Sequence, residues 1–224
     1  MESAITKEQV EKGHSVYSRR VLGIYDLLVF GVSTRLLWRC PTHRFIDHYN
    51  RHVTTNHLDV GVGTGYLLDN CRLRDEQARV GLMDLNVDCL HSAGERLSRH
   101  NIEKYTHNVL EPFNNPIEKF DSIGLFNLIH CVPGNLQEKG CLFSHLKSLL
   151  NDNGVIFGST VLGLKDTESK FTKLMMRLYS KKGVFNNLAD TAEDLERELS
   201  KRFNRAEVSV VGNVALFYAT DKSA

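Results

Sequence analysis

The sequence has 224 residues, 42% of them hydrophobic and 25% charged, so it is long enough to bury a core as one globular domain. Its 28 Lys and Arg nearly balance 27 Asp and Glu, and this net charge of +1 makes nucleic acid an unfavoured partner. No apolar stretch reaches the ~20 residues that cross a bilayer, and the polar N-terminus shows no secretion signal. We therefore expect a cytoplasmic protein without membrane insertion.

Cysteine and histidine usage gives no sign of a disulfide framework or a metal centre. The five cysteines are odd in number and form no C-x-x-C pair, which favours free thiols in a reducing compartment. The ten histidines show no zinc-binding spacing, so we predict no metal site.

The N-terminal quarter reads as helical. Residues 4–40 carry apolar residues at helical spacing and no strand alternation, Pro41 breaks this pattern, and residues 42–52 read as a short helix. We therefore expect a helical cap over residues 1–56, in front of an α/β core over residues 57–224.

From residue 57 onward, short apolar runs alternate with amphipathic segments. Strands are predicted at 57–60, 78–83, 105–109, 122–127, 155–161, 207–211 and 215–219, with helices at 66–72, 87–99, 139–150 and 191–203. This order predicts an α/β fold with a seven-stranded, mostly parallel sheet and helices on both faces. Only three residues separate the last two runs, so they should form a hairpin that makes the last strand antiparallel.

A glycine-rich segment directly follows the first predicted strand. Gly61, Gly63 and Gly65 alternate along the chain and lead into a helix. Glycines at this spacing permit a tight turn whose backbone comes close to a ligand at the helix N-terminus, although such turns also serve as plain corners. The spacing departs from the G-x-G-x-x-G of dinucleotide-binding loops, which weakens the case for a nicotinamide or flavin oxidoreductase.

An acidic residue, Asp84, ends the next predicted strand. A carboxylate at this place accepts hydrogen bonds from both hydroxyls of a ribose. The alternative is that Asp84 caps the helix that begins near Val87. Together with the glycine loop, Asp84 indicates a nucleoside-containing cofactor held across the strand ends.

These motifs resemble those of class I S-adenosylmethionine-dependent methyltransferases, whose Rossmann-like fold has the same strand order. An acidic residue before G-x-G-x-G corresponds to Asp59 here, and Asn108 stands where that family usually has an aspartate. The resemblance implies S-adenosylmethionine as the cofactor. It implies a cofactor site made of Asp59, Gly61, Gly63, Gly65, Asp84, Leu85, Asn86, Asn108, Val109 and Asn127.

The fourth predicted strand ends beside the reacting methyl group in that family, which directs attention to His130. A neutral imidazole is a suitable general base for an acceptor hydroxyl, so His130 is the predicted catalytic residue. The alternative is that His130 caps a strand end or binds backbone. Most of the catalysis would in either case come from orienting the acceptor on the methyl axis.

Two segments outside the core are predicted to select the substrate. Tyr17 and Tyr25 share a helical face that would either bind the cofactor or pack the cap on the sheet. Residues 162–190 form a predicted helical insertion, which the resemblance places over the acceptor pocket, with Phe171, Met175 and Phe185 as its expected lining. The same insertion carries a row of basic residues that would bind RNA or simply face solvent.

The leading hypothesis is a methyltransferase acting on a small, lipophilic acceptor of secondary metabolism, as a monomer or homodimer. The alternatives are an RNA or protein methyltransferase and a methyltransferase-like partner subunit without turnover. The acceptor atom, whether oxygen, nitrogen or carbon, stays open at this point.

Overall fold

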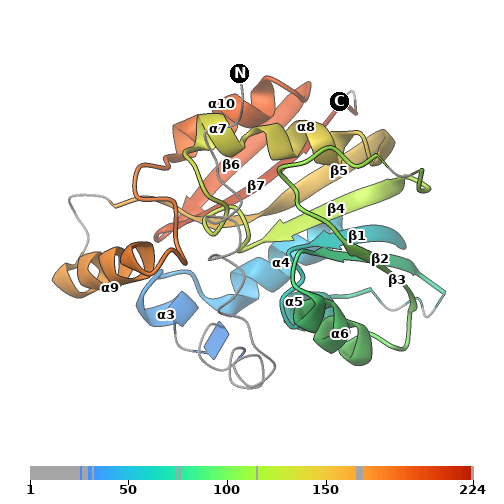
Figure 1. The fold of residues 1–224 in the computed structure, drawn as a ribbon, viewed down its shortest axis with the longest axis horizontal. Coiled ribbons are helices and arrows are strands. Elements are labelled where there is room, and N and C mark those ends of the chain that lie inside the picture. Colours follow the sequence, from blue (N-terminus) through green and yellow to red (C-terminus); the bar gives the residue numbers. More distant parts are fainter. Residues whose placement is uncertain are drawn as a thin grey trace.

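The computed structural model describes residues 26, 30, 31, 33–73, 75, 77–114, 116–164 and 169–222. Seven strands form one sheet in the order β3-β2-β1-β4-β5-β7-β6 (Figure 1). The strands are β1 Asn56–Val60, β2 Arg79–Asp84, β3 Asn101–Thr106, β4 Phe120–Phe126, β5 Leu150–Val161, β6 Arg205–Val211 and β7 Val214–Thr220. The helices are α3 Thr34–Leu36, α4 Thr42–His52, α5 Tyr66–Asn70, α6 Val87–Arg96, α7 Leu136–Lys139, α8 Cys141–Lys147, α9 Lys170–Lys181 and α10 Ala192–Ser200.

The predicted Rossmann-like sheet is confirmed, including its antiparallel end. Strand β1 pairs in parallel with β2 and β4, whereas β7 runs antiparallel to both β5 and β6. The turn between β6 and β7 contains Gly212, whose φ is +59°. A Cβ there would lie 2.4 Å from the Trp38 carbonyl oxygen, so this hairpin can pack on the N-terminal segment only with glycine at the turn.

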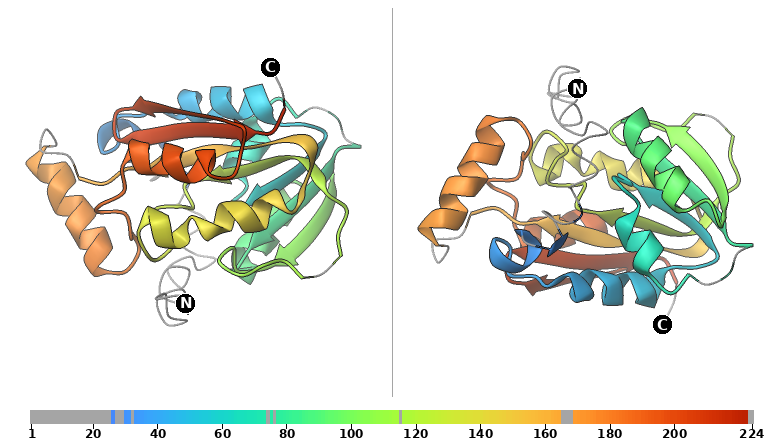
Figure 2. Two further views of the ribbon diagram at one scale, coloured as in Figure 1. Left: turned by 90° about the horizontal axis from the view of Figure 1, so that it is seen from above. Right: turned by 90° about the horizontal axis from the view of Figure 1, so that it is seen from below.

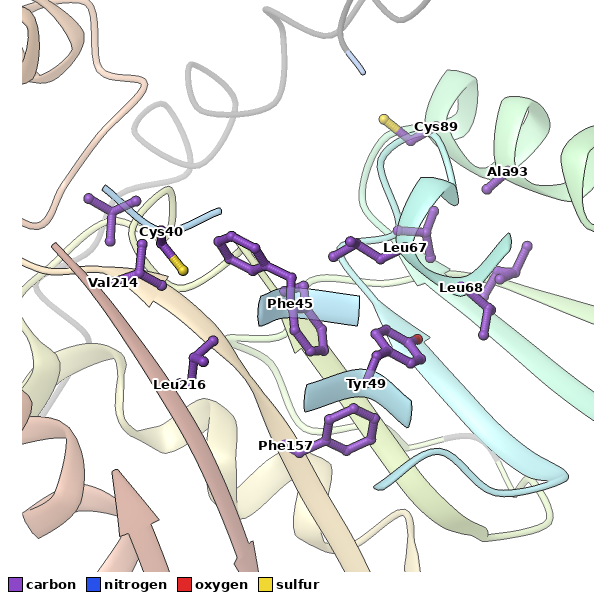
Figure 3. Packing of buried hydrophobic residues seen from close by; sticks show 14 of the residues in the cluster. Cys40, Phe45, Tyr49, Leu67, Leu68, Cys89, Ala93, Phe157, Val214 and Leu216 are labelled. Carbon is purple, nitrogen blue, oxygen red and sulfur yellow. The ribbon is translucent and has the colours of Figure 1, made fainter. Parts of the chain in front are cut away.

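Helices cover both faces of the sheet. Helices α4, α5 and α6 lie on one face, and α7, α8 and α10 lie on the other (Figures 1 and 2). Alternation along β7 sends Val214 and Leu216 into the first core and Ala215 and Phe217 into the second. The side chains between α4, α5 and the sheet form the first of these two cores (Figure 3).

Helix α4 lies within the predicted N-terminal cap. Pro41 stands at its N-cap position in an extended conformation, and the residues at positions 45, 48 and 49 bury one face of the helix against the sheet. The aromatic rings of Phe45 and Tyr49 are fully buried, and each contributes roughly 1.5–3 kcal/mol through removal of apolar surface from water. His48 Nε2 lies 2.8 Å from the Phe217 carbonyl oxygen, which fixes the helix on β7.

Three predicted elements differ clearly from the structure, and one of them is β5, which begins at Leu150, five residues before the strand predicted at 155–161. The helix expected at 139–150 is divided into α7 and α8 at Gly140, where a Cβ would lie 2.6 Å from Glu198 Oε2. The third strand begins and ends earlier than 105–109, because β3 is an edge strand without a buried residue and therefore lacks the apolar signal of the inner strands. None of the described helices is long and apolar enough to cross a membrane.

Candidate active site

The glycine loop joins β1 to α5 and has the conformation that its spacing predicts. Gly61, Gly63 and Gly65 have φ angles of +70°, +53° and +73°, a region that residues with a Cβ rarely adopt. A Cβ on Gly61 would lie 2.9 Å from the side chain of Leu128, whereas one on Gly63 would meet nothing within 4 Å. Gly61 therefore permits close packing against the loop after β4, and Gly63 borders open space.

That open space is a pocket at the carboxyl ends of β1, β2 and β4. It lies where the strand order reverses on either side of β1, the usual ligand site of open α/β sheets. Among the described residues, it is lined by Phe30, Tyr49, Asp59, Gly61, Val62, Gly63, Thr64, Tyr66, Leu67, Met83, Asp84, Leu85, Cys89, His107, Asn108, Val109, Leu110, Phe126, Asn127, Leu128, Cys131, Val132 and Pro133.

The structure brings most of the predicted cofactor residues together. Eight of them line the pocket: Asp59, Gly61, Gly63, Asp84, Leu85, Asn108, Val109 and Asn127. Gly65 and Asn86 stand beside it, Gly65 as the N-cap residue of α5 and Asn86 as that of α6. Tyr17 and Tyr25 lie outside the described residues.

The Asp84 carboxylate is held at the end of β2 by backbone groups. Oδ1 accepts from Asn86 N at 2.9 Å, and Oδ2 lies 3.5 Å from Gly63 N. The side chain of Asn86, in turn, accepts from Asp88 N. Because Asn86 supplies the cap of α6, the alternative that Asp84 caps this helix is wrong, and Asp84 instead links the glycine loop to the strand end.

Two asparagines complete the polar side of the pocket. Asn127 has a φ of +57°, and its backbone N donates to the Ser159 carbonyl oxygen at 3.0 Å, so β5 holds a left-handed residue at the pocket. Asn108 stands where the aspartate was expected. Its Oδ1 accepts from Leu110 N at 3.1 Å, and its Nδ2 donates to Glu111 at 3.1 Å. These local bonds fix the orientation of the Asn108 carboxamide.

Asp59 is the most perturbed acid in the pocket. Asp59 is only 6% exposed, and burial raises the pKa of its carboxyl to about 7. The hydrogen bond from Tyr49 opposes this shift, and the charge of Asp84 adds to it. The Tyr49 hydroxyl donates to Asp59 Oδ1 at 3.0 Å. Asp59 therefore changes charge near neutral pH, which its place in the sequence does not reveal.

The segment before α4 also contributes to the pocket. The Phe30 ring, which lines the pocket, stacks on Tyr66 with a centroid distance of 4.8 Å. Asp26 accepts from Arg96 Nη2 at 2.7 Å and from the Thr64 hydroxyl in the glycine loop. Phe30 falls within residues 4–40, which the sequence predicts to be helical, but no local signal in the sequence indicates that its ring lines the pocket.

The structure does not support His130 as a general base. His130 is 4% exposed and is absent from the pocket lining. Its Nδ1 accepts a hydrogen bond from Val161 N at 3.2 Å. Its ring packs edge-on against the Phe185 ring, with 4.5 Å between the ring centroids. Burial, and then the charge of Lys139, lowers the pKa of its imidazole to about 3. In this structure His130 binds backbone, as the alternative in the sequence analysis held, and a role as general base remains a prediction from sequence alone.

The predicted substrate-lining residues also lie away from this pocket. Phe171 is 62% exposed, because α9 turns Thr172 and Met176 inward instead. Met175 is partly buried against the first core, and Phe185 is 8% exposed and packs against the rings of Trp38 and His130. Helix α9 projects at the margin of the sheet (Figures 1 and 2), and none of its residues lines the pocket described here.

The fold and the pocket define a Rossmann-like protein that binds a nucleoside-containing cofactor across the strand ends. Residues 58–156 match a family model described as a methyltransferase domain. Demethylluteothin O-methyltransferase of Streptomyces thioluteus is 36% identical, over 95% of this chain and 92% of its own. The physcion biosynthesis cluster O-methyltransferase of Aspergillus chevalieri is also 36% identical, over 93% and 95%. A solved DhpI–SAH complex aligns with a TM-score of 0.66 at 15% identity, over 96% of this chain and 97% of that one. The chain belongs to the class I S-adenosylmethionine-dependent methyltransferases.

The pocket fits the cofactor of this family. Gly63 borders open space that a Cβ would fill, so the loop backbone can lie against a ligand. The carboxylates of Asp59 and Asp84 both line the pocket. The Asp84 carboxylate would accept from ribose hydroxyls, and the Asp59 carboxylate would face the positively charged methionine half. When bound, S-adenosylmethionine supplies an electrophilic methyl group on a sulfonium.

Proposed function

We propose that the protein methylates a hydroxyl group of a small, lipophilic metabolite. The observation that carries this proposal is the apolar part of the pocket lining, of which Phe30, Leu128, Cys131, Val132 and Pro133 are here called the apolar wall. A wall of this composition favours an apolar acceptor over a polyanion or a charged peptide. The two relatives described above, which match nearly the whole chain, are both named O-methyltransferases, and this supports oxygen as the acceptor atom.

In this proposal the chain acts by orientation and exclusion of water. The polar groups Asp59, Asp84 and Asn127 fix the cofactor, while the apolar wall holds the acceptor oxygen in line with the methyl group. The acceptor would lose its hydroxyl proton to bulk solvent before it enters the pocket, and its oxygen would then take the methyl group from the sulfonium, which would leave as a neutral thioether. Because His130 lies outside the pocket, an acidic hydroxyl such as a phenol or enol is the preferred acceptor.

A methyl-transfer assay with labelled S-adenosylmethionine tests this proposal. Matched pairs of acceptors, each an apolar phenol and the corresponding aniline, are compared with bulk tRNA and a mixture of histones. We expect label in the phenols and at most traces in the anilines, the RNA and the proteins. Label confined to the anilines would refute hydroxyl transfer, and label confined to tRNA or histones would refute a small-molecule acceptor.

A further inference from the structure

A chain of buried hydrogen bonds leads from Asp59 away from the pocket. The Tyr49 hydroxyl lies 3.0 Å from Asp59 Oδ1 and 2.7 Å from His57 Nε2. His57 precedes Asp59 by two residues on β1, so both side chains face α4. Figure 3 shows the Tyr49 ring between α4 and the sheet, beside Phe157. The Tyr49 hydroxyl thus binds both the Asp59 carboxylate and the His57 ring.

The chain continues beyond His57 to the opposite end of the strand. His57 Nδ1 lies 2.8 Å from Ser122 Oγ on β4, which is its direct register partner in the sheet. Ser122 Oγ lies 2.9 Å from Thr54 Oγ1, and Thr54 Oγ1 donates to the Asn56 carbonyl oxygen at 3.0 Å. The hydrogen bonds therefore run along β1 from a half-buried threonine at one end to Asp59 at the other.

The interior is built around this chain of groups. Tyr49, His57 and Ser122 have no solvent exposure. Position 124 is glycine, and a Cβ there would lie 3.2 Å from both the Tyr49 hydroxyl and His57 Cε1. Buried polar groups cost stability unless every donor finds an acceptor, so the order of donors along the chain is constrained.

Two donor orders satisfy the bonds that link Asp59, Tyr49, His57, Ser122 and Thr54. With Asp59 ionised, the Thr54 hydroxyl turns from the Asn56 carbonyl oxygen to donate to Ser122, the Ser122 hydroxyl donates to His57 Nδ1, His57 Nε2–H donates to Tyr49, and Tyr49 donates to Asp59. With Asp59 protonated, each bond reverses: Asp59 donates to Tyr49, Tyr49 to His57 Nε2, His57 Nδ1–H to Ser122, and Ser122 to Thr54. Burial lowers the pKa of His57 to about 3, so its ring stays neutral and carries one N–H in both orders.

We propose that Tyr49 and His57 are positioning residues that couple the charge of Asp59 to the tautomer of His57, and so hold Asp59 as a carboxylate when a cationic ligand enters the pocket. This inference rests on the proposed role of Asp59 toward the methionine half of the cofactor. Ligand binding stabilises the ionised form of Asp59 and with it the Nε2–H tautomer of His57. His57 lies outside the pocket lining, whereas Tyr49 lines the pocket beside Asp59 and acts in this role through its hydrogen bond to that carboxylate.

The charges around Asp59 set the pH range of this coupling. Burial raises the pKa of Asp59 to about 7, Tyr49 opposes the shift through its hydrogen bond, and Asp84 on β2 adds to it. Cys71, which follows α5, has a pKa raised to about 11 and stays a neutral thiol. Loss of the Tyr49 hydroxyl therefore raises the pKa of Asp59 and shifts its ionisation to higher pH.

Calorimetric binding of S-adenosylmethionine to Tyr49→Phe, from pH 6 to 8.5, tests the coupling. A rise of about one unit in the Asp59 pKa makes binding about five-fold weaker than wild type at pH 7 and less than two-fold weaker at pH 8.5. The cofactor's own amino group titrates equally in both proteins and cancels in this ratio. Tyr218→Phe is the matched control, because the Tyr218 hydroxyl also binds a carboxylate, Glu207, but lies outside the pocket lining.

Two further measurements separate the possible failures. Asp59→Asn should bind the cofactor more weakly at pH 8; unchanged affinity would overturn the role of Asp59 itself. Nitrogen-15 NMR of His57 should show Nδ1–H in the free wild-type protein at pH 6 and Nε2–H when the cofactor saturates it at pH 8. A Tyr49→Phe ratio that is constant with pH, or a His57 tautomer that does not change, would overturn the coupling and leave the role of Asp59 intact.

Discussion

Replacing Asp59 by asparagine should stabilise the protein at alkaline pH. Burial raises the pKa of this carboxyl from 3.8 to about 7, so the folded state resists its ionisation. The resulting cost is nearly absent below pH 4, grows between pH 4 and 7, and is fully present above pH 7. At ~1.36 kcal/mol per unit, the cost reaches about 4 kcal/mol at pH 8 and about 1.7 kcal/mol at pH 5. Asparagine keeps an oxygen that accepts from Tyr49 and carries no charge.

Urea unfolding of wild type and Asp59→Asn at pH 5 and pH 8 measures this cost. The free energy of unfolding of the variant relative to wild type should rise by about 2.6 kcal/mol between the two pH values, with similar urea dependence. Asp121→Asn, at an exposed position on β4, serves as the control, because solvent hydrates that side chain in the folded and unfolded protein alike. A difference between Asp59→Asn and wild type that stays constant with pH would refute the assignment of a buried, raised acid.

Three other substitutions test the site and its support. Asp84→Ala removes the carboxylate that the Asn86 and Gly63 amides face, and should weaken binding of S-adenosylmethionine by about ten-fold or more in calorimetry; equal affinity would remove its ribose role. His130→Ala should lower the melting temperature and leave kcat within about three-fold, because the ring is buried against protein; a hundred-fold loss of kcat in a stable variant would restore the general base. Lys139→Met breaks a buried ion pair with Asp190 and should cost about 3–5 kcal/mol in urea unfolding; recovery in Lys139→Met with Asp190→Leu would show that the loss comes from the orphaned carboxylate.

The cofactor side of the pocket was predictable because its signals are local. Three glycines within five residues require one backbone path, and Asp84 follows a strand whose apolar run marks its end. The chain of buried hydrogen bonds from Asp59 through Tyr49 and His57 to Ser122 was not predictable from local signals. His57 and Ser122 meet only because β1 and β4 pair in one particular register, and Tyr49 joins them only after α4 has packed on the sheet. Contacts of this kind depend on tertiary structure, which periodicity does not encode.

His130 shows that a residue close in sequence to the pocket can still face away from it. It lies three residues after Asn127, which lines the pocket, but the left-handed Asn127 and the tight turn that follows redirect the chain. Cys131 N donates to the Leu128 carbonyl oxygen at 2.8 Å, and this turn directs Leu128 to the pocket and His130 to the interior. The left-handed Asn127 thus stands at the start of the turn that separates Leu128, in the pocket lining, from the buried His130.

The long connection after β5 reaches the acceptor wall from behind. Asn186 Nδ2 donates to the Cys131 carbonyl oxygen at 3.1 Å, and the buried Lys139 ammonium donates to the carbonyl oxygens of Val132, at 3.4 Å, and of Asn186, at 3.1 Å. The ion pair of Lys139 with Asp190 anchors the same connection. Cys131 and Val132 both line the pocket, so these hydrogen bonds connect the pocket lining to residues 183–190. If the apolar wall holds the acceptor as proposed, a substitution at Asn186 should change the position of that wall, and with it the choice of substrate, without touching the acceptor.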